Sequence, residues 1–301
     1  MFMGNKGIIM GNYIKIGLLF LLALVVLVVA VKPDFVSAAV GPSKGHAQVI
    51  IPAQAVEVTP GIFYLGTAMH EGKEVEGYAF VRYEKEYAKP VRCNYDGICQ
   101  KGEGASCTDC AGNVTTTCYA FISKGARWKV IEPYVVNPSN ARGLDGMFIA
   151  DNLATDIGKW EGAAVKDILG TGTTTSEPLS ADTSAPDGRN EVYFADVGQN
   201  GAIAITIVWG VFRGSASQKQ LVEWDQVYDD VDYDWSAAGE AGKMDFENIA
   251  THELGHSVGM SDLYSGSCGQ ETMYGYADYG ETNKRTLESG DITGVKLLYS
   301  G

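Results

Sequence analysis

Short runs in which apolar and polar residues alternate occur throughout residues 39–91. Examples lie at 48–51, 61–65 and 78–83, separated by glycine, proline and charged residues. A period of two residues is typical of half-buried strands. The pattern therefore predicts a small β-rich N-terminal region, and the sequence indicates no chemistry for it.

The pattern changes at Cys118 to that of one mixed domain that reaches residue 301. An apolar segment at 128–136 predicts a strand, and apolar residues about 3.6 positions apart over 141–160 predict an amphipathic helix. A loop rich in Gly, Ser and Thr follows at 169–190. Strands are then expected around 191–195, 202–212 and 221–228.

Two helices are expected near the C-terminus. One covers 246–258, with Asp245 as its N-cap, and the other covers 290–299. Together with the strands, these helices place residues 118–301 in the α+β class.

The first 38 residues follow the order of a secretory signal. Lys6 and Lys15 precede an apolar run at 16–31, and small residues then favour cleavage after Ala38. The run is long for a signal and slightly short for a membrane span, so an uncleaved anchor is the alternative. In either case we expect the remaining chain to be secreted or extracellular, with membrane contact through residues 16–31 alone.

The composition fits a folded, acidic protein. Of 301 residues, 46% are hydrophobic, and the formal net charge is -14, or -16 without residues 1–38 (20 basic against 36 acidic). This composition excludes disorder as the main state. Because such a charge repels phosphate and no Lys/Arg cluster occurs, nucleic acid is not an expected partner.

Four of the six cysteines crowd into residues 92–110, which we interpret as a Cys-rich module followed by a linker at 111–117. A spacing of C-x4-C-x8-C-x2-C would place disulfide candidates at positions 93, 98, 107 and 110. The residue at position 98 is Ile98, however, so the second candidate is its neighbour Cys99, beside Cys93, Cys107 and Cys110. Export favours disulfides here, although two cysteine pairs are also a zinc-ligand pattern.

Acidic residues lie between these cysteines, at Asp96, Glu103 and Asp109. They could hold structural Ca²⁺. A second acidic group, at the end of a predicted strand, could bind a structural cation: Asp225, Asp229, Asp230, Asp232 and Asp234. Solvated acidic turns are the simpler alternative.

The other two cysteines, Cys118 and Cys268, have no other obvious partner. We expect a disulfide between them. It would link the start of the mixed domain, residues 118–301, to the loop before Met273.

Residues 252–262 carry the strongest chemical signal, H-E-x-x-H-x-x-G-x-x-D on a predicted helix. Side chains four residues apart lie on one helical face, so His252 and His256 can bind one metal ion. Neutral imidazole suits zinc. Glu253 is rotated by about 100 degrees from His252, which places its carboxylate beside a metal-bound water as general base.

A third ligand is required for such a site. A continuous helix would carry Asp262 about 15 Å beyond the first histidine, so the helix must end before it. Gly259 can take a left-handed conformation that turns the chain back. The two remaining histidines of the chain lie upstream, so a carboxylate is expected, with Asp262 favoured and Glu281 as the alternative.

The motif resembles that of the metzincin zinc endopeptidases, in particular the matrixin-like branch, with Asp262 in place of the usual third histidine. The resemblance covers 118–301 and is strongest from residue 246 onward. It implies a twisted mixed sheet, an active-site helix below a cleft and a small C-terminal subdomain.

The resemblance also assigns roles to residues after the motif. Gly275 stands where matrixins often have Pro. Residues 90–96 faintly resemble the matrixin segment in which a prodomain cysteine occupies the zinc. This resemblance would make residues 39–91 a prodomain. The implied roles are a Met-turn at Met273, a substrate pocket walled by Tyr274 and Tyr276, and a C-terminal helix with Asp291 and Tyr299 at matching positions.

The sequence therefore predicts a secreted zinc endopeptidase that hydrolyses polypeptides through a metal-activated water, with no small-molecule cofactor. One alternative is a non-catalytic surface or adhesion protein that keeps a structural metal. It is disfavoured because structural zinc sites are closed, whereas three protein ligands leave one position open. A second alternative is a metallohydrolase that acts on non-peptide amides or short peptides.

Overall fold

The computed structural model describes residues 48–88 and 117–300, which lie in one compact unit of the chain. The expected signal or anchor at 1–38, the Cys-rich module at 92–110 and residues 111–116 of the linker lie outside the described residues. The roles expected for these segments therefore stay predictions.

The position of one cysteine in the module needs correction. A disulfide candidate at position 98 is wrong, because Ile98 carries no thiol and the cysteine is the next residue, Cys99. The first spacing of the module is therefore C-x5-C rather than C-x4-C. The pairing of the module's four cysteines lies outside the described residues.

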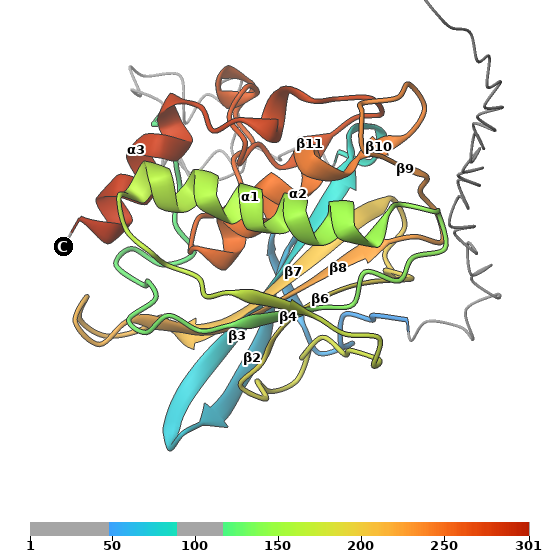
Figure 1. Ribbon diagram of the computed structural model, residues 1–301. Coiled ribbons are helices and arrows are strands. Elements are labelled where there is room, and N and C mark those ends of the chain that lie inside the picture. The colour runs from blue at the N-terminus through green and yellow to red at the C-terminus, as the bar shows by residue number, and fades with distance from the viewer. Residues whose placement is uncertain (1–47, 89–116, 301) are drawn as a thin grey trace, which may run out of the picture. The chain divides into compact units, whose positions relative to one another are not determined.

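A mixed sheet of nine strands forms the framework of the described residues (Figure 1). Its members are β1 Val56–Thr59, β2 Ile62–His70, β3 Lys73–Glu84, β4 Tyr134–Val136, β5 Gly172–Thr174, β6 Asn190–Ala195, β7 Ala202–Val211, β8 Gln220–Asp229 and β11 Tyr276–Ala277. The order is β1-β2-β3-β7-β8-β6-β4-β5, and β11 pairs with β3. Strands β4, β5, β6 and β8 run parallel, whereas β7 is antiparallel to both of its neighbours.

Helices α1 (Gly146–Ala164) and α2 (Phe246–Ser257) lie side by side over one face of this sheet, and α3 (Ser289–Tyr299) packs against α1 (Figure 1). The pair β9 (Trp235–Ser236) and β10 (Met244–Asp245) leads directly into α2. The α+β class and the two C-terminal helices expected from the sequence are confirmed.

The first helix begins five residues later than expected. Apolar spacing placed its start at residue 141, but α1 starts at Gly146 because the Asp145 carboxylate accepts the N–H of Phe148 and caps it. Residues before the cap are held as a loop, since the Asp230 carboxylate accepts the N–H of Ala141 at 2.6 Å. The start of α1 is therefore set by its N-cap residue and not by the spacing of its apolar residues.

The strand expected over 128–136 is wrong for most of its length, because only Tyr134–Val136 pairs as β4. The Trp128 indole instead donates to the Ser257 carbonyl at 2.7 Å, which anchors this segment to the end of α2. A further strand, β5, lies inside the segment that the sequence analysis expected to be a loop.

The N-terminal strands extend the sheet formed by residues 118–301. Strands β1, β2 and β3 are antiparallel to one another, and β3 then pairs along most of its length with β7. Residues 39–91, expected as a small β region, therefore contribute three strands to the same sheet as residues 118–301.

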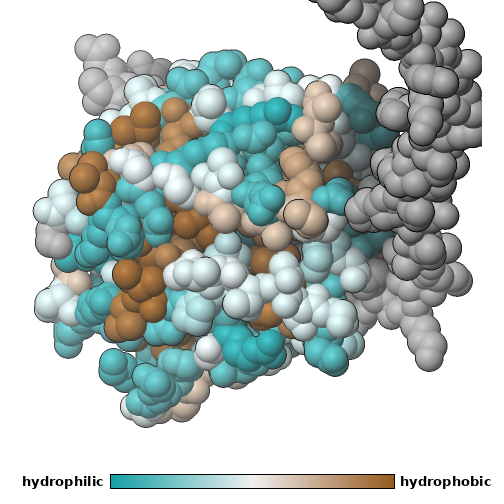
Figure 2. Space-filling model, in the orientation of Figure 1, coloured by the Kyte–Doolittle hydropathy of each residue, from teal (hydrophilic) through white to brown (hydrophobic). Residues whose placement is uncertain are grey.

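Two apolar clusters fill the two faces of the sheet. The helix-side cluster includes Trp160, Phe246 and Met273, and the opposite cluster includes Val75 and Trp209. On the face shown in Figure 2, hydrophilic side chains predominate and apolar ones form small separate groups. No helix within 48–88 and 117–300 is long and apolar enough to cross a membrane.

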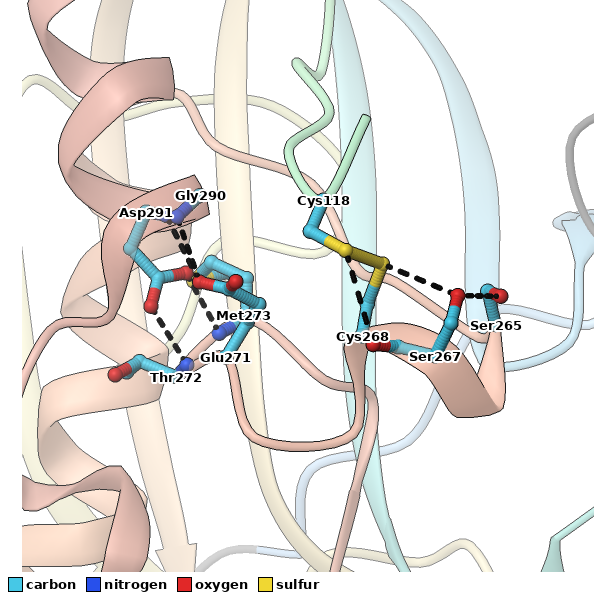
Figure 3. The surroundings of a disulfide bond; sticks show 9 residues. All are labelled: Cys118, Ser265, Ser267, Cys268, Glu271, Thr272, Met273, Gly290 and Asp291. Atoms are coloured by element: carbon cyan, nitrogen blue, oxygen red, sulfur yellow. Dashed lines mark hydrogen bonds between the residues drawn. A yellow bond between two sulfur atoms is a disulfide. The ribbon is translucent and has the colours of Figure 1, made fainter. Parts of the chain in front are cut away.

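A disulfide joins Cys118 to Cys268, the pair for which the sequence analysis expected a bond (Figure 3). The bond connects residues 150 positions apart. Figure 3 shows the neighbouring turn, in which the Asp291 carboxylate accepts the backbone N–H groups of Thr272 and Met273 at 2.7 and 3.1 Å. Helix α3 is thereby fixed to the segment that passes beneath α2.

Candidate active site

Helix α2 presents two imidazoles at one point. Asp245 caps the helix by accepting the N–H of Asn248, and His252 and His256 follow one turn apart on the same face. Their Nε2 atoms lie 3.1 Å apart. Both side chains are buried, with 1% or less of their surface exposed.

The turn after α2 returns a carboxylate to these imidazoles. Gly259 has φ +100, a conformation that favours glycine, and the helix ends there as expected. Asp262 then places Oδ1 3.2 Å from His252 Nε2 and 3.5 Å from His256 Nε2. Glu281, the alternative third ligand, instead contacts the Lys284 ammonium group.

The three donor atoms fit a zinc ion. Zinc ligands at 2.0 to 2.1 Å in tetrahedral geometry lie about 3.3 Å from one another. The observed separations of 3.1, 3.2 and 3.5 Å match this value. Asp262 Oδ1 is buried and has no hydrogen-bond partner, a costly state that a bound cation would relieve.

Hydrogen bonds behind the donors fix their orientation. His252 Nδ1 donates to the Thr272 carbonyl at 2.7 Å, and His256 Nδ1 donates to the Met260 carbonyl at 3.1 Å. These bonds place the proton on Nδ1 and leave the Nε2 lone pairs directed at the metal position. The Tyr264 hydroxyl lies 3.0 Å from Asp262 Oδ2.

Burial and the neighbouring charges together set the pKa values of the donors. It lowers the pKa of His252 to about 3, and the buried Arg82 guanidinium adds to the effect. His252 is therefore neutral at physiological pH, which is the form that binds zinc. For Asp262, burial favours the protonated form, but the imidazoles outweigh it and hold the pKa of this carboxyl well below its usual range.

Glu253 lies next to this cluster without belonging to it. Its Oε2 accepts a hydrogen bond from the Thr206 hydroxyl of β7, and its Oε1 is buried without a hydrogen-bond partner. Burial raises the pKa of Glu253 to about 7. A carboxyl group with a pKa near neutral is suited to accept and release a proton.

Met273 is buried and packs against Gly255 of α2. A Cβ on Gly255, between the two histidines, would lie only 2.1 Å from the Met273 sulfur, so only glycine fits there. The Tyr299 hydroxyl donates to the Val258 carbonyl at 3.0 Å and holds the end of α2. Tyr274 and Tyr276, expected to wall the substrate pocket, line a surface pocket together with Lys85, Glu281 and Lys284.

Sequence reasoning missed three residues that surround Glu253 and His256. Thr206 gave no signal, because threonine is ordinary in a strand. Phe80 stacks on the His256 ring, with centroids 4.2 Å apart. Arg82 could have been noticed, since it is a cation within the apolar run 79–83, and it is 1% exposed.

A second group of carboxylates lies apart from the histidines. Asp182, Glu223 and Asp225 bring oxygen atoms within 4.8 Å of one another. Burial raises the pKa of Glu223 to about 9, and the charge of Asp182 adds to this shift. The acidic residues expected to group with Asp225 act elsewhere: Asp229 accepts backbone N–H groups at 197, 231 and 232, and Asp234 pairs with an arginine.

Two histidines and a glutamate on one helix, followed by a glycine turn that returns a third ligand, are the arrangement of the metzincin class of zinc metalloproteases, and here the third donor is an aspartate oxygen instead of the usual imidazole. Residues 192–300 match the family model for matrixin. This part of the chain, from β6 to the end of α3, is a matrixin metalloprotease domain, and matrixins are zinc metalloendopeptidases. A search of curated proteins found no match to the chain.

Replacing Gly259 by alanine should weaken zinc binding about tenfold or more, because φ +100 is strained for any residue with a Cβ and the Asp262 turn would shift. The added Cβ would also lie 3.0 Å from Leu298 and 3.2 Å from the Ala126 carbonyl. Competition with a chelator measures the affinity. Gly158→Ala, in α1 with open space around it, is the control, and equal affinities in the two variants would contradict the argument.

The cluster of Asp182, Glu223 and Asp225 predicts that the folded protein loses stability as the pH rises. The folded state keeps a proton on Glu223 that the unfolded state releases near its ordinary pKa of 4.5. Stability should therefore be greatest below this value and fall until the pH reaches about 9. In Glu223→Gln the fall in Tm over this range should be smaller, with the exposed Glu240→Gln as control. Parallel Tm profiles would show that Glu223 does not titrate as described.

Proposed function

We propose that this protein is an exported zinc endopeptidase in which His252, His256 and Asp262 hold the metal and Glu253 is the general base. The convergence of three buried donor atoms within 3.5 Å of one another, beside the Glu253 carboxylate, carries the proposal. Matrixins are typically extracellular, which supports the export expected from residues 1–38.

The residues around the cluster divide the work of peptide hydrolysis. Bound zinc would supply a coordinated water with a pKa near 7 and polarise the scissile carbonyl. Glu253 takes the proton of the water and passes it to the departing amine. Thr206 holds Oε2 of this carboxylate in place and leaves Oε1 for the proton. Tyr274 and Tyr276 wall the pocket for the side chain after the scissile bond.

The rival function, a surface protein with a purely structural metal, is less consistent with the site. A structural zinc site has four protein ligands, whereas three donor residues lie together here. The neighbouring carboxylate, that of Glu253, is the group proposed as the general base. The second rival, a hydrolase of short peptides or other amides, is separated from an endopeptidase by cleavage inside a long unfolded protein such as casein.

Glu253→Gln should keep zinc and lose casein hydrolysis by about three orders of magnitude, because the amide cannot accept the proton. Zinc content by metal analysis and the rate of casein cleavage are measured on the same sample. Glu247→Gln, the same change earlier on α2, should retain both. Near-normal turnover in Glu253→Gln would show that another group is the base.

We also propose that the carboxylates of Asp182, Glu223 and Asp225 bind a structural Ca²⁺ ion. Oxygen donors suit calcium, and Glu223 Oε1 is buried without a hydrogen-bond partner. Calcium chloride should raise the Tm of the unaltered chain and have a smaller effect on Glu223→Gln, because Ca²⁺ would displace the proton of Glu223 to gain a carboxylate ligand, which the amide cannot supply. The same Tm increase in both proteins would place the calcium elsewhere.

A further inference from the structure

A cleft of about 540 Å³ lies between α1 and the edge strand β5. A volume of this size is typical of ligand sites. Its lining includes none of the metal donors and not Glu253. Three strands, β8, β6 and β4, separate β5 from β7, whose Thr206 contacts Glu253. At about 4.8 Å per strand, the cleft is a separate site about 19 Å away across the sheet.

Strand β5 is the last strand of the sheet on this side. Within 48–88 and 117–300, no further strand pairs with it. The Thr175 N–H donates inward, to the Val136 carbonyl of β4 at 2.8 Å. Backbone groups of successive residues point to opposite sides of a strand, so those of Gly172 and Thr174 point outward, away from β4. An edge of this kind can pair with an added extended chain.

The cleft beside this edge combines an apolar lining with acidic groups. Its buried lining is apolar, each side chain being 5% exposed or less, and consists of Tyr134, Ile157 and Leu169. Three lining residues are acidic, namely Asp151, Glu161 and Asp167, and none of the described residues that line the cleft is basic. A long apolar stem that ends in a positive charge fits both features. Lysine and arginine side chains are of this kind.

The Tyr134 hydroxyl is a polar group without a partner in this cleft. It makes no hydrogen bond to any of the described residues, although the side chain is buried. A Cβ at Gly172 would lie 2.6 Å from this oxygen, so only glycine fits where the hydroxyl meets the edge strand. Burial raises the pKa of Tyr134, and the charge of Glu161 adds to the effect, so the hydroxyl keeps its proton. It is therefore available to a ligand as a hydrogen-bond donor.

The end of α1 holds one acidic residue at the cleft through a strained turn. Val165 ends the helix with φ 55, a left-handed conformation that is unfavourable for a β-branched residue, and its side chain is exposed. Glu161 Oε1 accepts the N–H groups of Ile168 and Leu169 at 2.7 and 2.9 Å, which fixes the same turn. Strain that the surroundings maintain is typical of functional segments. Here the turn carries Asp167 to the cleft.

We propose that the cleft and the outer edge of β5 form a second substrate-binding site, which takes an extended segment of the polypeptide with a lysine or arginine side chain in the cleft. The inference rests on the proposed endopeptidase function. The segment would add a strand to β5, and its basic side chain would meet the acidic residues. A second copy of the chain is a poor occupant, because each copy has a net charge of -14 and the two acidic surfaces repel.

Only a long substrate can use both sites. About six extended residues, at about 3.3 Å each, are needed to span about 19 Å, in addition to those held in either site. Binding at β5 would raise the local concentration of the rest of the polypeptide at the metal. The cleft would therefore lower the KM for long polypeptides and leave the cleavage step unchanged.

The first test fills the cleft. Ala154→Trp, in its lining, should raise the KM for casein about tenfold and leave kcat unchanged. Thr155→Trp, at the next position of α1 and exposed outside the lining, is the matched control. Hydrolysis of a six-residue peptide should be equal in all three proteins, because this peptide is too short to reach β5. An unchanged KM for casein in Ala154→Trp, or an equal loss with the short peptide, would overturn the proposal.

The second test reverses one charge. Asp167→Lys should raise the KM for casein about fivefold, because the cleft then repels a basic side chain, and added salt should reduce the difference. Glu240→Lys changes the net charge equally at an exposed position outside the cleft. Equal KM values in the two variants would show that charge does not select the ligand.

Binding is also measured without hydrolysis, on the Glu253→Gln chain. A fluorescent hexapeptide of alternating valine and lysine should bind, detected by fluorescence anisotropy, and should lose about tenfold in affinity when Ala154→Trp is added. The same peptide with glutamate in place of lysine should bind at least about tenfold more weakly. Equal binding of the two peptides, or equal binding with and without Ala154→Trp, would contradict the assignment.

Sedimentation separates the proposed occupant from a second copy of the chain. The unaltered chain should be a monomer. A dimer that dissociates in Ala154→Trp and persists in Thr155→Trp would show that a second copy covers β5, which would overturn the proposal.

Failure of this inference is distinguishable from failure of the proposed function. If the unaltered chain hydrolyses casein in a Glu253-dependent manner and the lysine peptide does not bind, the protease function stands and the second site falls. If the peptide binds in the cleft but the unaltered chain hydrolyses no protein, the proposed function falls and the cleft stands as a peptide-binding site only.

Discussion

Three buried donor atoms, the Nε2 atoms of His252 and His256 and Oδ1 of Asp262, lie within 3.5 Å of one another. Burying a carboxylate oxygen without a hydrogen-bond partner is costly, and a cation bound between the donors offsets that cost. Such an arrangement needs a rigid surround. The cap at Asp245, the turn at Gly259 and the hydrogen bonds to both Nδ1 atoms supply it. Asp291 ties α3 to the backbone of Thr272, whose carbonyl accepts His252, and Tyr299 ties α3 to the end of α2.

Strand β7 connects this chemistry to the N-terminal part of the chain. Its Thr206 orients the carboxylate of Glu253, and the neighbouring backbone edge pairs with β3 at Phe80. Phe80 also stacks on the His256 ring, so the N-terminal strands contact the metal donors as well as the strand that supports Glu253.

Local rules predicted the part of the site that is local in sequence. The spacing of His252 and His256 on a helix, the turn at Gly259 and the return of Asp262 follow from helix geometry and from the special conformations of glycine. Contacts between strands that are far apart in the sequence could not be predicted in this way. The roles of Thr206 and Arg82 depend on which strand pairs with which, and short alternating runs do not specify their partners. Helix α1 starts later than predicted because Asp145, the residue before it, is its N-cap. The spacing of apolar residues contains no information about such a cap.

The pairing of β3 with β7 also has a cost and a benefit beyond the site. Strand β7 is almost wholly apolar and buried, so its edge would be a template for association with other chains if it were left bare. Pairing with β3 satisfies its backbone groups while the protein folds. Without this pairing the same backbone groups would be left to water, and the apolar side chains of β7 would be exposed with them.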